Sequence, residues 1–444
     1  MKLPWSTHQL VVWLACGSFI FWSVSKITAW KSPRPHERAV WWIAALISGC
    51  GWLVTGFPRA IVERSTGAIF DLDKNPWTAF GTIDQATSMQ AMISISAALM
   101  VLLMALDIAS ERRGRYVLVL AVTVSGFITA VAGLCLHTSA DLSSLWQVRH
   151  VPSSVFGLFW YHGNAAAFLN LVWPVSVWLC VTLLHKESPT FPQQMVLACL
   201  VVAVMVQIIA VLVNVSKMGH LMLVLEMLLL VGGGLVAWKA RLAELPFSGR
   251  RIALLLFIAI SLLVLGAWLS GAGTGLGRWN IFAAHHFDDP ARRHAAMMAF
   301  QIGLDHGWAG TGPGTFEWVA VHYSALDPLL QEGRWRHAHN DYAEFFAEWG
   351  WSGAVIFVLV LALPGRRLWS ALRHVFSKDS RHGMSFQRKA GLICFSTALF
   401  SVLLHAVVDF PLQMESTRYL SAAVAGLVLA MTFSSSRRAS RRSA

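Results

Sequence analysis

The sequence has few charged residues. Asp, Glu, Lys and Arg make up only 13% of its 444 residues, whereas hydrophobic residues make up 56%. The charged fraction of a soluble globular protein is usually nearer a quarter, so this composition excludes that class. Several apolar runs reach about 20 residues, the length that a helix needs to cross a hydrocarbon core about 30 Å thick. We therefore predict an all-α polytopic membrane protein, because helices satisfy their own backbone polar groups in lipid.

Motifs for nucleotide binding are missing. No G-x-x-x-x-G-K-[ST] run occurs, and the glycine cluster GAGTGLG at 271–277 lacks the spacing of a phosphate-binding loop. Chemistry driven by a nucleotide is therefore not expected. The six cysteines lie inside apolar runs without the spacing of metal ligands, so we interpret them as small buried hydrophobic residues.

The sequence also lacks a signal-peptide cleavage site and internal repeats. Residues 9–30 are long enough to cross a membrane and no small-residue cleavage site follows them, so the first span itself is expected to target the chain. Many secondary transporters carry inverted repeats and interrupted helices. Neither pattern occurs in this sequence, which disfavours a transporter or flippase.

The apolar runs predict eleven spans, or about 11–12 when an uncertain one is counted. They lie at 9–29, 39–56, 88–108, 116–136, 163–184, 195–215, 219–238, 251–270, 351–363, 390–409 and 417–433. If the amino terminus lies outside, most Lys and Arg residues fall in cytoplasmic segments, as the positive-inside rule requires. Basic cytoplasmic loops then explain the net charge of +12 without a nucleic-acid partner.

This topology divides the chain into five parts. They are amino-terminal transmembrane helices at 1–150, central transmembrane helices at 151–270, a large and partly helical outer loop at 271–350, carboxy-terminal transmembrane helices at 351–433, and a basic cytoplasmic tail at 434–444. Long loops are uncommon unless they are functional or disordered, and this one contains Trp, Phe and Tyr. We therefore expect the outer loop to be folded and to carry the active site.

The most polar segment of the outer loop is RWRHAHNDYAEFFAEWGWSG. Asn340 or Asp341 is the predicted cap of a short helix, with Glu344 three residues beyond Asp341 as in a capping box. His337 and His339 precede its first turn. Three interpretations are open: a surface helix with an acidic stripe and solvated histidines, a zinc site built on the histidines, or an imidazole that acts as general base on a hydroxyl.

Arginines are frequent in the outer loop. Arg278, Arg292, Arg293, Arg334 and Arg336 lie on the side of the membrane that the topology rule depletes of positive charge. A guanidinium binds phosphate oxygens bidentately and stays charged, so we interpret these residues as an anion site that suits a diphosphate. Ordinary salt bridges to acidic residues of the same loop are the alternative.

Four further polar residues lie at or near membrane depth. His405 and Asp409 are four apart, on one predicted helical face near the outer end of the tenth span, and Ser216 and Lys217 lie at an outer turn. Ionisable residues in such places are costly and usually face a bundle interior or a wet cavity. Both a role in lining a site and structural pairing are open for them.

Three segments follow one another in a set order. They are ARRHAAMMAFQIGLDHGWAGTGPGTF, HAHNDYAEFFAEWGWSG and LLHAVVDFPLQ, and the stretch FGLFWYHGNAAAFLNLVWP precedes them. This combination, which covers roughly residues 150 to 430, resembles the O-antigen ligase and polymerase superfamily of bacterial inner-membrane glycosyltransferases. The resemblance implies a GT-C-like fold and a metal-independent enzyme without a cofactor. Such an enzyme transfers a glycan from an undecaprenyl-diphosphate carrier to an acceptor on the periplasmic side.

The resemblance also implies roles for individual residues. His339, which directly precedes an asparagine, is the implied base and His337 its accessory, while Arg292 is the implied contact of the carrier diphosphate. The family often has Ser-Arg where this chain has Ser216-Lys217, so a point charge replaces a planar fork there. The full set of expected site residues is His339 and His337 for catalysis; Arg292, Arg293, Lys217 and Arg336 for the diphosphate; and Asn340, Asp341, His405, Asp409, Gly312 and Gly314 in support.

The motifs do not fix the acceptor. The resemblance allows lipid A-core in a ligase, a second carrier-linked glycan in a polymerase, and a protein side chain in an oligosaccharyltransferase. Membrane lipid is an expected partner and nucleic acid is not. A transporter or flippase remains the alternative from a different class of protein.

Overall fold

The structure is a computed structural model, and it is almost entirely helical. It describes residues 15, 17–20, 22–24, 37–72, 80–138, 155–185, 190–239, 289–325, 327–331, 335–376 and 384–433. The chain forms two compact units. The first contains Met1–Leu106, Asp289–Leu368 and Ala406–Gly426; the second contains Asp107–Asp288, Trp369–His405 and Leu427–Ala444. The predicted division into five consecutive parts stays a prediction.

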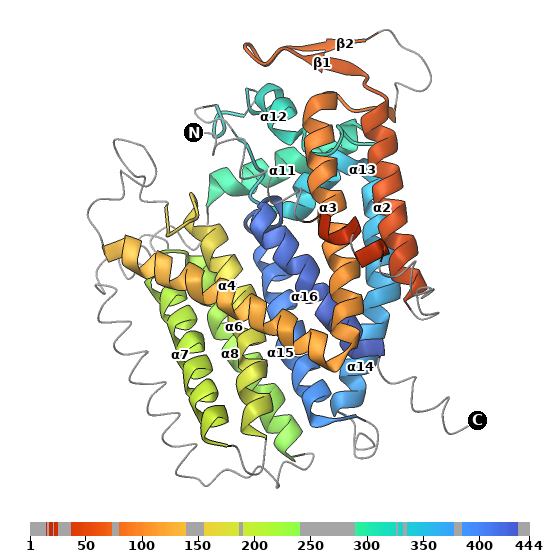
Figure 1. Cartoon of the computed structure of the whole chain (residues 1–444). Helices are drawn as coiled ribbons and strands as arrows, with labels where there is room; N and C mark the ends of the chain where they lie inside the picture. Colours follow the sequence, from red (N-terminus) through yellow and green to blue (C-terminus); the bar gives the residue numbers. More distant parts are fainter. Residues whose placement is uncertain are drawn as a thin grey trace, which may run out of the picture. The chain divides into compact units, whose positions relative to one another are not determined.

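The first unit combines long helices with an irregular end that carries a β-hairpin (Figure 1). Its elements are α2 (Arg38–Gly56), β1 (Ala60–Val62), β2 (Ile69–Asp71), α3 (Gln85–Ser110), α11 (Pro290–Asp305), α12 (Phe316–Ser324), α13 (Asp341–Val360), the π-helical turn η2 (Leu361–Gly365), the 3-10 turn η4 (Pro411–Gln413) and α16 (Glu415–Phe433). The strands pair antiparallel, with Ala60 opposite Asp71 and Val62 opposite Ile69. The hairpin, α11 and α12 lie at one end of this unit, from which α2, α3 and α13 run away (Figure 1).

Helix α13 organises the first unit. It packs against α2, α11 and α12, and its buried Ala347 joins Ala299 and Ile302 of α11 and Phe316 of α12 in one hydrophobic core. The helix bends at Gly350, whose φ of 55° and ψ of −148° are not helical. A Cβ there would lie 2.1 Å from the carbonyl oxygen of Gly307, so only glycine fits. The short helix predicted after Asn340 is confirmed as the start of α13, and it joins the ninth span with a kink at Gly350.

The second unit is built around one buried helix. Its elements are α4 (Arg112–Thr138), α6 (His162–Leu184), α7 (Phe191–Val213), α8 (Lys217–Lys239) and α15 (Phe386–His405), and α14 (Arg366–Phe376) belongs mostly to it. Helix α6 packs against α4, α7, α8 and α15. Buried polar groups cross these contacts: the Asn170 amide donates to the Gly219 carbonyl at 2.8 Å, and the Trp173 indole donates to Glu226 at 2.5 Å. Such bonds between helices add to packing in lipid.

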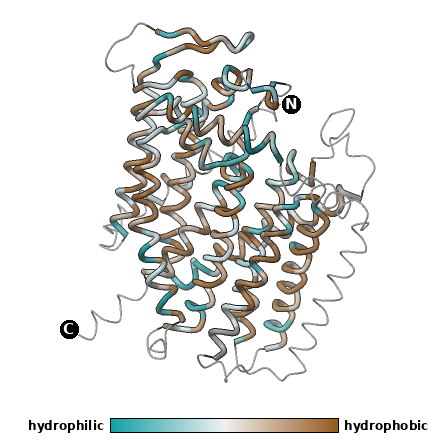
Figure 2. Tube along the Cα trace, turned by 180° about the vertical axis from the view of Figure 1, so that it is seen from behind, coloured by the Kyte–Doolittle hydropathy of each residue, from teal (hydrophilic) through white to brown (hydrophobic). Residues whose placement is uncertain are grey.

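Eight helices of the described chain are long and apolar enough to cross a membrane. They correspond to eight of the predicted spans: α2, α3, α4, α6, α7, α8, α16, and α13 with its continuation into α14. Figure 2 shows hydrophobic residues along most of the length of these helices. The chain is therefore an all-α polytopic membrane protein. The predicted span at 251–270 lies outside the described residues, and most of the one at 9–29 does too.

One predicted span is too long. The sequence predicted a helix over 390–409, but α15 ends at His405, and Asp409 lies beyond it in the turn that leads to η4. The prediction that His405 and Asp409 share one helical face is therefore wrong. Pro411 explains part of the difference, because proline removes a backbone donor and disfavours a helical conformation of the residue before it; Phe410 has a φ of −126° and a ψ of 47°.

Candidate active site

The turn before α13 places two histidines. The Asn340 side chain caps the helix by accepting the backbone N–H groups of Tyr342 and Ala343, both at 3.0 Å. Asn340 is thus the cap, and the predicted capping box with Glu344 is wrong. The Glu344 carboxylate instead accepts the Ala338 N–H at 2.7 Å and lies 2.9 Å from Nδ1 of His337. The Glu344 side chain therefore stabilises the turn that precedes the helix and does not cap the helix.

His339 has an unusual backbone. Its φ is +50°, and it is the one non-glycine residue of the described chain with a positive φ. Residues with a Cβ rarely adopt this left-handed backbone conformation, and those that do are often found at functional sites. Nδ1 of His339 lies 3.2 Å from Oδ1 of Asp409, whose side chain is 4% exposed. The strained backbone and this bond together fix the direction of the imidazole.

Residues 406–412 complete the site from the other side. The Asp341 N–H donates to the Ala406 carbonyl at 2.9 Å, and the Leu412 N–H donates to Oδ2 of Asp341 at 2.8 Å. These bonds attach the turn after α15 to the first residue of α13. Asp341 therefore acts as a structural link beside His339, and Asp409 is held at the imidazole.

Phe410 lies between the two histidines. Its ring stacks on His337 with centroids 4.4 Å apart and meets His339 edge to face at 4.9 Å. Each histidine also has its own carboxylate, Glu344 for His337 and Asp409 for His339. The site is thus a pair of histidine–carboxylate dyads on either side of one aromatic ring.

The acidic residues of α13 are buried. Asp341, Glu344 and Glu348 are 4%, 2% and 5% exposed, so the interpretation as a solvated acidic stripe is wrong. Glu348 accepts the Phe316 N–H at 3.2 Å and so ties α12 to α13. A zinc site on the two histidines is not favoured either: the described residues contain no group of three or more His, Cys, Asp or Glu side chains that could hold a metal ion.

The glycine-rich loop GTGPGTF supports α13. The N–H groups of Thr311 and Gly312 donate to the carbonyls of Ala347 and Glu348 at 3.0 and 2.9 Å. Gly312 has a φ of +105°, and a Cβ there would lie 2.2 Å from Oγ1 of Thr82. Gly314 likewise has a φ of +76°, and its Cβ would meet Ala91 of α3 at 2.7 Å. These glycines allow the loop to pass between α13 and the start of α3.

Charges around His337 favour its protonated form. Burial lowers the pKa of the imidazole, but the carboxylates of Glu344, Glu348 and Glu317 raise it more, so the net pKa lies above the usual value. The charged ring is therefore favoured more strongly than in a free histidine. In this protonated state both ring nitrogens of His337 are donors.

The raised pKa of His337 predicts a pH-dependent stability. A group whose pKa is higher in the folded state stabilises the fold fully below its unfolded pKa of about 6.5, and loses this contribution as pH rises through the folded value. We expect the thermal midpoint of the detergent-solubilised protein to fall between pH 6.5 and the raised pKa. His337→Gln should show a flatter pH dependence. Equal slopes for wild type and variant would contradict the assignment.

Residues 200–358 match the family model described as O-Antigen ligase. The matched segment carries Lys217, Arg292 and both histidines of the site. This segment is similar to the O-antigen ligase family. No curated protein matches its sequence. The match supports a glycosyltransferase-like enzyme with an O-antigen ligase or polymerase type of function, in a multi-pass membrane protein.

The described arginines expected at the site lie on exposed or partly exposed surface. Arg292 is in the first turn of α11, with Nε 3.1 Å from Asp289, while the side chain of Arg336 is 74% exposed and lies 3.9 Å from Glu317. Arg293 is exposed beside Arg292. Part of the salt-bridge alternative is therefore confirmed. Exposed ion pairs contribute only about 0.2–1 kcal/mol, so a multiply charged anion can compete for these guanidiniums.

Two expected site residues belong to the second unit. Lys217 is the first residue of α8 and follows Ser216, whose N–H donates to the Asn214 side chain at 2.8 Å. His405 is the fully buried last residue of α15. The proposed diphosphate contact of Lys217 and the supporting role of His405 stay predictions. The predicted Arg278 and Arg334 lie outside the described residues.

Three residues that hold the site, Glu344, Phe410 and Arg418, were not among the expected site residues. Phe410 and Glu344 contact the histidines directly, as described above. Arg418 holds the turn before α16 by donating to the carbonyls of Leu412 and Gln413 at 2.8 and 3.3 Å and to Ser94 at 3.0 Å. A signal existed for Arg418, because it is a charged residue inside a predicted span.

Proposed function

We propose that this chain is a membrane glycosyltransferase that moves a glycan from undecaprenyl diphosphate to a hydroxyl of an acceptor, as an O-antigen ligase does. The reaction takes place at the periplasmic face of the bacterial inner membrane. A polysaccharide polymerase or a protein oligosaccharyltransferase would use the same site with a different acceptor.

The dyad of His339 and Asp409 supports the proposal most strongly. A general base needs a neutral imidazole whose free nitrogen points at the substrate, and the bond made by the other nitrogen sets the tautomer. With Nδ1–H donating to Asp409, Nε2 carries the lone pair. The left-handed backbone of His339 is a second argument. Its conformation costs free energy, so the surrounding structure must hold the residue, and with it the ring, in this direction.

The chemical step follows from this tautomer. Nε2 of His339 takes the proton from the hydroxyl of the acceptor substrate, while the oxygen of that hydroxyl forms a bond to the anomeric carbon of the donor sugar. The bond from that carbon to the diphosphate oxygen breaks, and the electron pair leaves with the diphosphate. The Asp409 carboxylate stabilises the imidazolium that forms, much as an aspartate does in Ser-His-Asp enzymes.

The chain's own cations would stabilise the leaving group. We assign the carrier diphosphate to Arg292, Arg293, Arg336 and Lys217, which makes the enzyme metal-independent. Guanidiniums suit this task because their planar fork matches phosphate oxygens. The energy for transfer comes from the bond between sugar and diphosphate, so no nucleotide is needed.

The test is reconstitution in proteoliposomes with a defined undecaprenyl-diphosphate glycan, an acceptor and excess EDTA. We expect glycan transfer and release of the diphosphate carrier in equal amounts. A product with one added glycan on lipid A-core indicates a ligase, whereas a ladder of carrier-linked products indicates a polymerase. Uptake of a solute without glycan transfer would instead support a transporter, and loss of transfer in EDTA would contradict metal independence.

Phe410 is a positioning residue in this proposal. Phe410→Leu keeps an apolar side chain but loses the aromatic contacts to both imidazoles, each worth about 0.5–1.5 kcal/mol. We expect kcat to fall about three- to tenfold, which corresponds to about 0.7–1.4 kcal/mol, with KM and thermal midpoint little changed. Phe300→Leu is the matched control, because Phe300 is 52% exposed and stacks on Phe346 instead. Equal kcat values for the two variants would exclude this role.

A further inference from the structure

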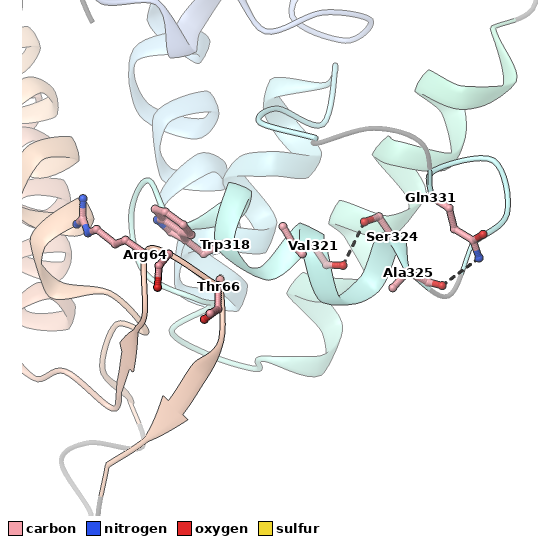
Figure 3. Close-up of a pocket in the computed structure, with 9 residues that line it drawn as sticks. Arg64, Thr66, Trp318, Val321, Ser324, Ala325 and Gln331 are labelled. Atoms are coloured by element: carbon pink, nitrogen blue, oxygen red, sulfur yellow. Dashed lines mark hydrogen bonds between the residues drawn. The ribbon is translucent and has the colours of Figure 1, made fainter. Parts of the chain in front are cut away.

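A pocket of about 570 Å³ lies in the first unit, apart from the two dyads (Figure 3). One wall is the turn between β1 and β2, and the other is α12 with the residues that follow it. The lining residues are 64–67, Trp318, Val321, Ser324, Ala325 and Gln331. This volume falls inside the range of about 300–1,000 Å³ that is usual for small-molecule sites.

The two walls are fixed to each other. Nε2 of His322 lies 3.2 Å from the Gly67 carbonyl oxygen, and the Arg64 guanidinium lies 5.8 Å from the centre of the Trp318 ring. The Trp318 indole N–H donates to Thr87 at 3.2 Å, which anchors the ring at the start of α3. The pocket is therefore largely preformed, and a ligand would bind without ordering it first.

The lining suits a neutral ligand with many hydroxyls. Its polar groups are the hydroxyls of Thr66 and Ser324 and the amide of Gln331, and its apolar surface comes from Trp318 and Val321. Each polar group already donates one hydrogen bond, to Glu63, to the Val321 carbonyl and to the Ala325 carbonyl respectively, the last two of which Figure 3 shows. Their oxygens keep acceptor capacity and the Gln331 amide keeps a second N–H, which suits the hydroxyls of a sugar.

The charge of the pocket is also balanced. Among the described residues that line it, the charged one is Arg64, whose guanidinium lies 3.1 Å from the Asp84 carboxylate. The guanidinium charge is thereby paired inside the protein, and a pyranose ring, with its apolar faces and polar rim, matches the remaining lining.

Helix α12 separates this pocket from the histidines. Trp318 lines the pocket, while its neighbour Glu317 faces Arg336 and raises the pKa of His337. Since a helix with its side chains is about 10–12 Å across, a short chain of sugars is long enough to reach from one side to the other.

We propose that this pocket binds a neutral saccharide unit of a glycan substrate, at some distance from the reacting sugar. The proposal rests on the proposed function. The pocket would then select the glycan and lower KM without taking part in the chemical step.

The binding test fills the pocket with a bulky side chain. Ala325 is exposed at the end of α12, so Ala325→Trp adds an indole to the pocket without disturbing the core. Leu329→Trp is the matched control, because Leu329 is 53% exposed on the following turn and does not line the pocket. Proteins in lipid nanodiscs are probed by saturation-transfer NMR with glucose, galactose, rhamnose, N-acetylglucosamine and glucuronate. Maltoside detergents are avoided because they would compete.

We expect at least one neutral sugar to give a signal with wild type, Leu329→Trp and His339→Asn, and to lose it with Ala325→Trp. No signal from any neutral sugar on wild type, a signal that Ala325→Trp keeps, or preference for glucuronate would each overturn the proposal. This binding needs no turnover, so its outcome is separate from that of the transfer reaction. If size-exclusion chromatography shows that Ala325→Trp does not fold, Gln331→Ala is tested with the same sugars, and loss of the signal is again the expected result.

Kinetics in the reconstituted reaction assign the source of the saccharide. Ala325→Trp should raise KM about tenfold for one glycan substrate and leave kcat within about twofold, because about 1.4 kcal/mol of binding is lost. A raised KM for the lipid-linked donor places donor sugars in the pocket, and a raised KM for the acceptor places acceptor sugars there. An unchanged KM for both would show that the pocket has no part in transfer.

Discussion

His339→Asn is expected to reduce kcat for glycan transfer by about 10²–10⁴, the usual contribution of a positioned general base. Asparagine cannot accept the hydroxyl proton at neutral pH. Asparagine tolerates the left-handed backbone conformation. For a residue such as alanine this conformation costs about 1–2 kcal/mol of folding free energy. Its amide can also donate to Asp409 in place of the imidazole. The variant should therefore fold and insert like wild type, and the loss should fall on kcat rather than on KM.

The comparison uses the same substitution elsewhere. His374→Asn changes an exposed histidine of α14 and should leave transfer within about twofold of wild type, as surface substitutions usually do. Thermal midpoint and size-exclusion profile report folding for both variants. Transfer by folded His339→Asn at the wild-type rate would show that another group takes the proton.

The helical part of the fold could be predicted from the sequence, because the hydropathy of a segment is enough to show that it crosses the membrane. Spans such as 163–184 and 39–56 were predicted to within one residue of α6 and α2. Lipid forces backbone pairing inside each helix, so an apolar run of sufficient length determines its own structure. The end of α15 was less predictable, since the apolar character continues through Ala406, Val407 and Val408 after the helix has stopped.

The site could be predicted only in its parts. His337 and His339 stood out as a polar pair in an apolar chain, and Asn340 was recognisable as a helix cap. The contact of His339 with Asp409 joins residues seventy positions apart, and no local pattern reports such a contact. The capping rule gave the wrong partner, because Glu344 has the spacing of a capping residue but bonds instead to residues 337 and 338 in the turn before the helix.

The backbone of the site was likewise hidden from the sequence. A histidine in the sequence does not predict a φ of +50°, because glycine and asparagine are the residues that most often adopt the left-handed conformation. The glycines of GTGPGTF gave a partial signal, since glycine marks close approach of backbone. The structure shows that Gly312 and Gly314 approach the start of α3, so their freedom serves packing around α13.

Asp409→Asn should be the second most damaging change, with kcat reduced by about 10²–10⁴. The amide keeps the size of the side chain and can still accept the Phe410 N–H that Asp409 accepts at 3.1 Å. It cannot balance the charge of the imidazolium. If the amide flips and gives up the Phe410 N–H, its NH₂ group can instead donate to Nδ1 of His339, because Oδ1 of Asp409 makes both contacts. The ring proton then moves to Nε2 and leaves no lone pair for the substrate.

A double variant distinguishes this role from simple structural support. If Asp409 acts only through His339, then adding Asp409→Asn to His339→Asn should reduce kcat by less than about threefold more, because groups that act as a unit are strongly non-additive. Losses that multiply would mean that Asp409 affects transfer by another route, such as the turn at 406–412. The same cycle with Phe410→Leu extends the test. A smaller effect of Phe410→Leu in the His339→Asn background than in wild type would show that the aromatic ring, like Asp409, acts by positioning Nε2 of His339.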